Sequence, residues 1–344
     1  MTIHIIFAKN ILSFFKINWI DVKFLVFLWK NDNITNYELL CFSFLKLLSN
    51  ICYMYYSNFN IIKHNKSKYN DICILKESEF QSDISIIIPV YINNIKDILQ
   101  LKKLIESIYI NLPSLIIIVN DGSPLNILEK IINLCQEYER ISLISVYPNS
   151  GPAKARNIGL DFVSKKDINI VCLTDLDCLL SKDYIKEIIN INKNDVLLCG
   201  TTYSYGNTIF DKFHDLYGTL NCRIFFNYKV LYAPTCNLVF KGKNIITKLR
   251  FDEDFPNAAF EDVEFCLRSR FHEKIDIIYI KNIKIIHIFN YENGFLLDII
   301  YFCKKFIKYA KNEKLLVNKF KDYPYLYNQS FPISSKTNNI LYIK

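Results

Sequence analysis

Two aspartates, Asp175 and Asp177, stand two positions apart directly after an apolar run. Residues two apart on an extended strand face the same way, and on the loop that follows they can still converge on one point. Converging carboxylates repel each other unless a cation lies between them. Magnesium and manganese prefer oxygen ligands and commonly keep a substrate diphosphate as a further ligand. The pair therefore predicts a divalent-metal site, and a solvated turn with a helix cap is the ordinary alternative for so short a motif.

A second group of acids lies downstream, at Glu261, Asp262 and Glu264. Neighbouring residues on a helix point about 100° apart, so Glu261 and Asp262 cannot both face one substrate. A partly buried carboxylate can act as a general base when it lies within hydrogen-bond reach of the proton that it removes. We expect one acid of this group to do chemistry and another to support an acceptor or the fold. Acids also complement the dipole of a helix that they begin, which is the structural alternative.

Three apolar runs predict the strands that position these acids: residues 84–88, 115–119 and 168–173. They are rich in Ile and Val and lead into Pro or Asp, as expected of strands buried on both faces of a parallel sheet. Apolar residues have helical spacing over 101–109, between the first two runs, and again over 128–135, between the second and the third. This alternation predicts a doubly wound α/β sheet, in which ligands bind at the carboxyl ends of the strands.

The chain contains five motifs in this order: SIIIPVY, IIIVNDGS, GPAKARN, LTDLDC and AFEDVEF. As an ordered set they resemble glycosyltransferase family 2, over residues 83 to about 290, roughly 60% of the chain. The resemblance implies the GT-A fold, a Rossmann-like mixed, mostly parallel α/β sheet flanked by helices, here with helical N- and C-terminal extensions. It also implies inverting transfer of a sugar from a nucleoside diphosphate, with UDP the expected nucleotide, to a hydroxyl acceptor.

By this resemblance, three segments form the nucleotide site. Asp121 matches the acid that accepts from the uracil imide in similar enzymes. Arg156 matches an arginine beside the base and phosphates, with Lys154 as a weaker candidate and an ordinary surface cation as the alternative. The residues that match the base-holding loop are Pro89, Val90 and Tyr91.

The same resemblance assigns roles to the acids. Asp175 matches the acid that touches the ribose and is also a candidate metal ligand, and Asp177 matches the acid that binds the metal. Asp262 is the expected catalytic base, with Glu261 as the alternate and Glu264 as the third choice. The expected cofactor is therefore a divalent ion, Mn²⁺ or Mg²⁺.

Three further residues are candidates by position. His287 follows an apolar run, where a histidine is usually a packed core residue, but in similar enzymes a histidine beyond the acidic pair completes the metal site. Thr235 and Asn237 lie in a segment that resembles the family's loop beside the transferred sugar and acceptor. We therefore keep both as candidate donor contacts.

The chain has 344 residues, of which 51% are hydrophobic, and the distribution of its residue types predicts three parts. Residues 1–80 form an apolar helical extension and linker, 81–294 the glycosyltransferase domain, and 295–344 a basic amphipathic helix and tail. The apolar stretch Leu39 to Tyr56 would reach about 27 Å as a helix, close to a ~30 Å bilayer core. Lys46 at its centre makes spanning costly, so we expect a helix packed on the enzyme or on another chain.

Charge concentrates at the C-terminal end: residues 295–344 carry nine Lys against three acids, +6 of the chain's formal +8. Phe295, Ile299, Phe302, Phe306 and Ala310 can share one helical face, and Lys304, Lys308 and Lys311 another. Such a helix predicts either contact with an anionic membrane surface and a lipid-linked or other glycan acceptor, or docking on the catalytic domain.

The cysteines and the missing motifs narrow the choice. Eleven cysteines without a Cys-x-x-Cys pair indicate free thiols and a cytoplasmic location, which includes the cytoplasmic face of a membrane. No Gly-x-Gly-x-x-Gly is present, and no nucleic-acid-reading element, so oxidoreductases and nucleic-acid partners are not expected. Processive polysaccharide synthases of the same family carry a Gln-x-x-Arg-Trp segment, which this sequence lacks, so a synthase is less favoured. A nucleotidyltransferase on a similar sheet and an inactive membrane-associated scaffold stay open as alternatives.

Overall fold

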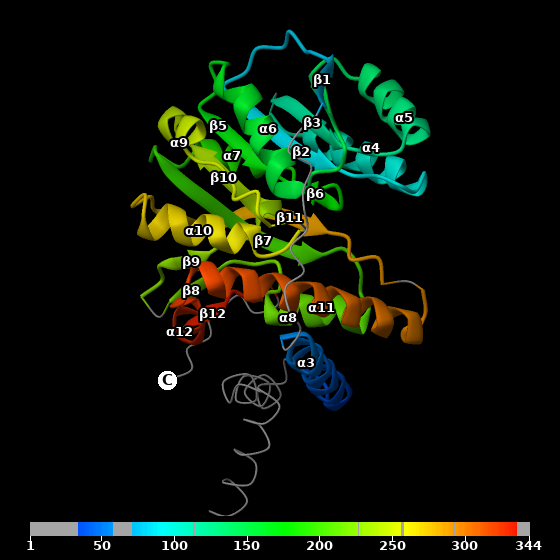
Figure 1. Cartoon of the computed structure of the whole chain (residues 1–344), viewed down its shortest axis with the longest axis vertical. Helices are drawn as coiled ribbons and strands as arrows, with labels where there is room; N and C mark the ends of the chain where they lie inside the picture. Colours follow the sequence, from blue (N-terminus) through cyan, green and yellow to red (C-terminus); the bar gives the residue numbers. More distant parts are fainter. Residues whose placement is uncertain are drawn as a thin grey trace, which may run out of the picture.

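A nine-stranded mixed sheet forms the centre of the chain (Figure 1). The structure is a computed structural model that describes residues 34–57, 71–112, 114–225, 227–255, 258–291 and 293–335. The strands of the central sheet are β1 (Asp71–Lys76), β2 (Ile84–Val90), β3 (Leu115–Asp121), β4 (Ile141–Tyr147), β5 (Ile170–Leu173), β6 (Cys178–Leu180), β7 (Val196–Ser204), β10 (Leu238–Lys241) and β11 (Ile277–His287).

The order across this sheet is β1-β4-β3-β2-β5-β10-β7-β11-β6. β4, β3, β2 and β5 pair in parallel, and so do β7 and β11. β10 is antiparallel to both β5 and β7, so the strands on its two sides run the same way. β1 and β6, at the two edges, are antiparallel to their neighbours. This mixed and mostly parallel sheet confirms the predicted α/β class.

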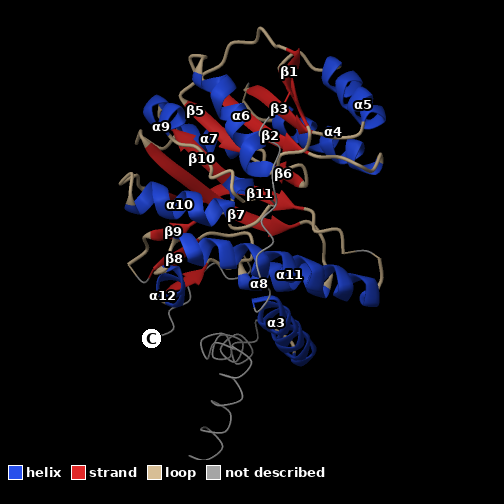
Figure 2. Cartoon of the chain, in the orientation of Figure 1, coloured by secondary structure: helices blue, strands red, loops and turns tan. Residues whose placement is uncertain are grey.

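Helices cover both faces of the sheet (Figure 2). Adjacent residues of a strand point to opposite faces, so Ile86 packs in the core with α4 and α5 while Ile87 packs in the core with α6. The helices are α3 (Asn36–Ser57), α4 (Lys96–Tyr109), α5 (Leu125–Gln136), α6 (Pro152–Ser164), α7 (Tyr184–Ile189), α8 (Ile209–Tyr217), α9 (Lys243–Lys248), α10 (Glu261–Phe271), α11 (Phe295–Lys319) and α12 (Tyr323–Asn328).

The three predicted strands are present as β2, β3 and β5, and two of them extend further than expected. Pro89 does not close β2, because it lies in register with Val119 of β3 and the strand runs on to Val90. Asp121 is the last residue of β3, since it lies in register with Val146 of β4. Both residues therefore stand at the carboxyl edge of the sheet.

A helical layer made of α3, α8 and α11 lies beside the sheet (Figure 1). Phe42 of α3, Phe210 and Phe213 of α8 and Phe302 of α11 are buried together. α3 contains the predicted helix over 39–56. Among the described helices, none combines the length and apolar character that crossing a bilayer requires.

The predicted boundaries between the three parts of the chain stay predictions. Residues 1–33 and 58–70, which include most of the predicted linker, lie outside the described residues. β1 precedes residue 81 and is not among the predicted strands, although it pairs with β4 at the sheet edge. A second, three-stranded sheet has the order β12-β8-β9, formed by β8 (Arg223–Phe225), β9 (Val230–Tyr232) and β12 (Ser330–Pro332).

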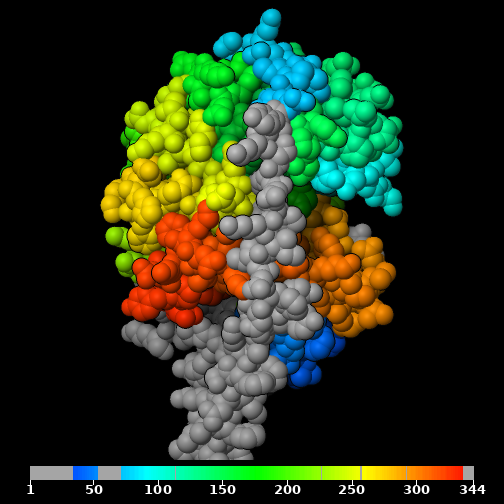
Figure 3. Space-filling model, in the orientation of Figure 1, coloured from blue at the N-terminus to red at the C-terminus, as the bar shows by residue number. Residues whose placement is uncertain are grey.

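The predicted amphipathic pattern of α11 is correct except at its first residue. Phe302 and Ala310 are buried, and Ile299 and Phe306 pack against the same cluster, whereas Phe295 is 60% exposed. Lys304, Lys308 and Lys311 are exposed. In the space-filling view, the C-terminal part of the chain, coloured orange to red, forms part of the exposed surface below the yellow and green region (Figure 3).

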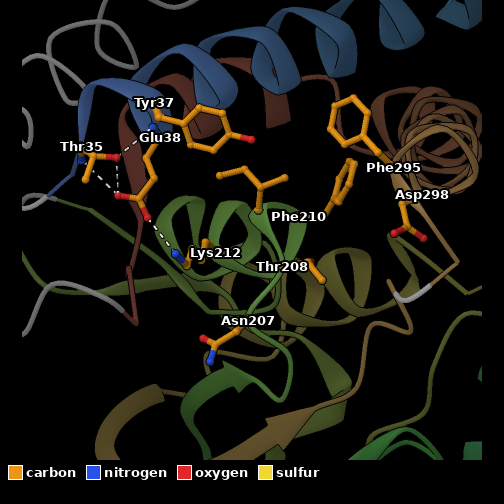
Figure 4. Close-up of a pocket in the computed structure, with 10 residues that line it drawn as sticks. Thr35, Tyr37, Glu38, Asn207, Thr208, Phe210, Lys212, Phe295 and Asp298 are labelled. Carbon is orange, nitrogen blue, oxygen red and sulfur yellow. Dashed lines mark hydrogen bonds and ion pairs between the residues drawn. The ribbon is translucent and has the colours of Figure 1, made fainter.

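An open pocket of about 490 Å³ lies where α3, α8 and the start of α11 meet (Figure 4). Glu38 of α3 and Lys212 of α8 form an ion pair of 3.0 Å at its side. Tyr37 and Phe295 are largely exposed next to it. This pocket lies among residues outside the five sequence motifs.

Candidate active site

A buried arginine joins three of the sequence motifs. Arg156, on α6, is 2% exposed and donates from Nη2 to Asp175 Oδ1 at 2.8 Å and from Nη1 to Glu261 Oε1 at 2.9 Å. Burial opposes the charge, but the two carboxylates hold the pKa of Arg156 above its ordinary value. Contact with a nucleotide stays a prediction for this residue. The structure gives its guanidinium a different task, holding Asp175 and the start of α10 together.

Glu261 and Glu264 are both used inside the fold. Glu261 Oε1 binds Arg156, and its Oε2 accepts from the Ala259 backbone N–H at 2.6 Å. Glu264 accepts two hydrogen bonds from Arg268, one turn later on α10, at 2.8 and 3.0 Å. Both glutamates are buried. Every oxygen of these two carboxylates thus accepts a hydrogen bond inside the fold, and a catalytic role for either glutamate stays a prediction.

Asp262 differs from its two acidic neighbours because no side chain of the described residues donates to it. Its Oδ1 accepts from the Val263 backbone N–H at 2.8 Å, and the residue is only half-buried. Burial, with the charge of Glu261 as the next cause, raises the pKa of Asp262 to about 7. A carboxylate with such a pKa is suited to accept a proton near neutral pH.

The end of β11 meets the start of β6 at a potential metal site. His287 lies in register with Cys178, and its Nε2 is 3.2 Å from Asp177 Oδ1. One donor atom each from Asp177, Cys178 and His287 lie within 4.8 Å of one another. Asp175 is not part of this group, since Arg156 holds it. The predicted metal ligands Asp177 and His287 therefore lie together. The third predicted ligand, Asp175, is instead bound to Arg156.

The donor atoms of this group fit a hard divalent ion in part. A carboxylate oxygen and an imidazole nitrogen are suitable ligands, and the buried His287 Nδ1 has no hydrogen-bond partner among the described residues. Burial raises the pKa of the Cys178 thiol well above its ordinary value, so the thiol stays protonated and is a poor ligand. Burial would also raise the pKa of Asp177, but His287 and Lys305 outweigh this and lower it. Asp177 is therefore ionised and ready for a cation.

The predicted base-holding loops lie next to each other. Ser123 Oγ accepts from the Ile92 backbone N–H at 2.9 Å, which ties the loop after β3 to the loop after β2. Asp121 is buried, and its two oxygens accept from the backbone N–H groups of Ser150 and Gly151, each at 2.8 Å. The carboxylate thus also anchors the N-terminus of α6.

The three residues of the predicted base-holding segment differ in exposure: Val90 is buried, Pro89 is half-buried and Tyr91 is 50% exposed. Of the three, Tyr91 has the side chain that is free to stack on a base. Contact of a base with this segment or with Asp121 stays a prediction.

The weaker candidates are placed less favourably. Lys154 Nζ lies 4.0 Å from Glu253. Asn237 donates to the carbonyls of Thr201 and Ile283 at 3.3 and 3.2 Å and accepts from Tyr184 at 3.2 Å, so its amide joins strands inside the fold. Thr235 is buried as well. The donor contacts proposed for these residues stay predictions.

Several residues near the metal pair are absent from the sequence motifs. The charge of Asp177 acts on Asp97 in the first turn of α4 and on Lys305, Tyr301 and Tyr309 of α11. Sequence spacing cannot reveal this group, because α11 follows Asp177 by more than 100 residues. The lysine pattern of the helix predicted either a membrane surface or docking on the catalytic domain, and it did not include Lys305.

The comparisons with known proteins agree on the class of enzyme. Residues 85–274 match the family described as Glycosyl transferase family 2. A protein of Haemophilus influenzae described as an uncharacterized glycosyltransferase is 28% identical over 205 residues, which cover 57% of this chain and 75% of that protein.

Two of the similar solved structures are more distant. S. aureus TarS 1-349 in complex with UDP-GlcNAc is 16% identical with a TM-score of 0.45, over 60% of this chain and 58% of that chain. The mannosyltransferase PcManGT from Pyrobaculum calidifontis, in complex with GDP-Man and Mn²⁺, is 11% identical with a TM-score of 0.45, over 74% and 69%. This chain thus matches less than two thirds of the length of the TarS structure.

The predicted family and the predicted enzyme class are confirmed. The family match spans more than half of the 344 residues. The chain belongs to glycosyltransferase family 2.

Proposed function

We propose that this glycosyltransferase moves a sugar from a nucleoside diphosphate donor, with UDP as the expected nucleotide, to a hydroxyl acceptor by direct displacement with inversion. The observation that carries the proposal is that the three acids of α10 have different partners. Asp262 is left half-buried with a pKa raised to about 7, while Glu261 and Glu264 are occupied by arginines.

In this proposal, Asp262 accepts the proton of the acceptor hydroxyl as the oxygen attacks the sugar. Glu261 and Arg156 fix the start of α10 and thereby the place of Asp262 relative to Asp175. Asp177 and His287 are the side chains that would hold a divalent ion, Mn²⁺ or Mg²⁺. A bound ion would supply positive charge to the departing diphosphate.

We further propose a glycan or lipid-linked acceptor and peripheral contact with the cytoplasmic face of a membrane. Two features support it: exposed lysines on α11, and the exposed apolar residues Phe295, Leu296 and Leu297 at its first turn. Together they suit an anionic lipid surface. Replacing Lys308 and Lys311 by Gln should weaken sedimentation with phosphatidylserine vesicles, and unchanged sedimentation would contradict the contact.

The first test of the proposed reaction is a screen of UDP- and GDP-sugars with Mn²⁺, comparing the wild type with Asp177→Ala. Release of a nucleoside diphosphate that needs both the metal and Asp177 would support the donor class and the metal site together. Release of pyrophosphate would instead support a nucleotidyltransferase. A wild type that hydrolyses no donor, with or without a panel of hydroxyl acceptors, would contradict the proposal.

A further inference from the structure

We propose that Lys305 of α11 is a binding residue for the diphosphate of the donor. This inference rests on the proposed function and adds a cation from the C-terminal helix to the nucleotide site. Among the described residues of the five sequence motifs, no lysine is paired with Asp177 or His287, the two predicted metal ligands. The helix supplies one from outside the matched family region, which ends at residue 274.

The ammonium of Lys305 is held by aromatic rings rather than by a carboxylate. Its Nζ lies 4.5 Å from the ring centroid of Phe289, 5.4 Å from that of Tyr301 and 5.9 Å from that of Tyr291. Aromatic faces attract a cation and fix its place without neutralising it. The Nζ of Lys305 forms no hydrogen bond or ion pair with any part of the chain that the structure describes. Its charge therefore remains available to an anion.

A series of contacts links this ammonium to Asp177 and His287, and the charge of Lys305 acts on Asp177. The Phe289 ring, which Lys305 touches, lies 4.4 Å from the His287 ring, and His287 is 3.2 Å from Asp177. Burial lowers the pKa of Lys305 to about 8, and the nearby charge of Asp177 opposes this. The acids whose charges act on Lys305 are Asp177 and Asp211, and a cation bound to Asp177 would offset the first of these charges. A diphosphate bound to that cation would bring new negative charge to the same place.

The position of α11 is fixed well enough for such a role. The helix runs across the molecule between the central sheet and α3 (Figure 1). Phe302, one turn before Lys305, is fully buried against α8. Further along, Asn312 donates to the carbonyl of Ala259, just before the acidic segment, at 2.9 Å. The helix is thus attached on both sides of Lys305, which preorganises the cation.

A neighbouring lysine offers a matched control. Lys304 has the same side chain on the same helix turn, but it is exposed and makes no contact with the aromatic rings around Lys305. A general effect of positive charge on an anionic ligand would appear in both variants. Contact with the diphosphate would appear in only one of them.

The experiment measures binding by calorimetry with Mn²⁺, for UDP, GDP, ADP and CDP and for the corresponding nucleosides. We expect Lys305→Met to weaken binding of the preferred nucleoside diphosphate at least tenfold and to leave binding of its nucleoside unchanged. Lys304→Met should bind both as the wild type does, and Lys305→Arg should recover part of the affinity. Thermal unfolding of each variant checks that the fold is intact.

Each other result has one meaning. Equal diphosphate affinity of wild type and Lys305→Met would overturn the role of Lys305 and leave the proposed function standing. Equal loss of nucleoside and diphosphate affinity would overturn it as well, since it would indicate a structural role. A wild type that binds none of the four diphosphates would overturn the proposed function, and the inference with it.

Discussion

At the scale of single residues, Arg156 is the side chain on which the site depends most. It is a buried cation between Asp175 and Glu261, and removing one partner of a buried pair leaves an unpaired charge. We expect Arg156→Met to lower the free energy of unfolding by about 3–5 kcal/mol. Urea denaturation measures this.

The matched control for Arg156 is Lys193→Met. Lys193 forms an exposed ion pair of 2.8 Å with Asp276, and such pairs contribute about 1 kcal/mol or less. If Arg156→Met were as stable as Lys193→Met, the buried network would not hold the site together in the way we describe.

Asp262 allows a prediction about pH. The base must be ionised, and its pKa is raised to about 7, so turnover should rise as the pH increases through about 7 and then level off. Asp262→Asn should lower turnover by about 10²- to 10⁴-fold and remove this rise. The control Asp276→Asn changes an exposed acid and should keep both rate and profile. A profile that survives in Asp262→Asn would assign the base elsewhere.

The same pKa gives a check on folding. The folded protein keeps the proton of Asp262 to higher pH than an unfolded chain does, so ionisation of this residue disfavours folding as the pH rises from about 4 to about 7. Asp262→Asn lacks this penalty and should be at least as stable as the wild type above pH 7. Loss of activity in this variant can then be separated from loss of structure.

The sequence indicated candidate acids but not the side chains that bind them. Motif order and the family resemblance favoured Asp177 as a metal ligand and Asp262 as the base, and both roles stay predictions. The spacing could not show that Arg156 would turn toward Asp175 and Glu261, since its two partners lie 19 and 105 residues away. Nor could it show that Glu261 would bind Arg156 while Asp262, the next residue on α10, accepts only from the Val263 backbone N–H among the described residues.

At the scale of elements, α11 connects stability to the site. Phe302 is fully buried and its ring lies 5.2 Å from that of Phe213 and 5.8 Å from that of Phe210. Phe302→Ala should therefore destabilise the protein by about 3–5 kcal/mol through the lost burial and the cavity. Because Lys305 lies one turn away, the variant should also raise the KM for the donor.

Phe295→Ala is the control for Phe302→Ala, since Phe295 lies on the same helix and is 60% exposed. Thermal unfolding and donor titration measure both effects. A destabilised Phe302→Ala variant with an unchanged KM would show that the helix supports the fold without supporting the site.

Three of the parallel strands were predicted from the sequence, whereas β4, β7 and the antiparallel strands were not. Continuous apolar runs revealed β2, β3 and β5 because both faces of each strand are buried. β10 has only four residues, and its place between β5 and β7 depends on pairing with strands distant in sequence. β1 is an edge strand whose residues are mostly exposed, so it lacks the apolar signal. Pairing of this kind is a property of the tertiary fold.

At the scale of the whole molecule, the site gathers residues from segments far apart in the chain. Asp177 follows β5, Asp262 begins α10, His287 ends β11 and Lys305 lies on α11. A ligand that contacts several of these segments binds only the folded chain. It should therefore stabilise the entire fold and not only one loop.

A site built from distant segments has a predictable effect on thermal unfolding when its ligands bind. At a free ligand concentration of 100 times Kd, binding adds about 2.7 kcal/mol to the free energy of unfolding, which raises the midpoint by several degrees. We expect this rise with Mn²⁺ and the preferred nucleoside diphosphate together, and a smaller one with either alone, because Asp177 and His287 offer two protein ligands and the diphosphate supplies others. In Asp177→Asn, the rise in the unfolding midpoint that depends on Mn²⁺ should be lost, and any rise due to the nucleotide alone should remain. If Mn²⁺ raised the midpoint of Asp177→Asn as much as that of the wild type, the ion would bind elsewhere on the chain, and the metal site at the ends of β5 and β11 would be wrong.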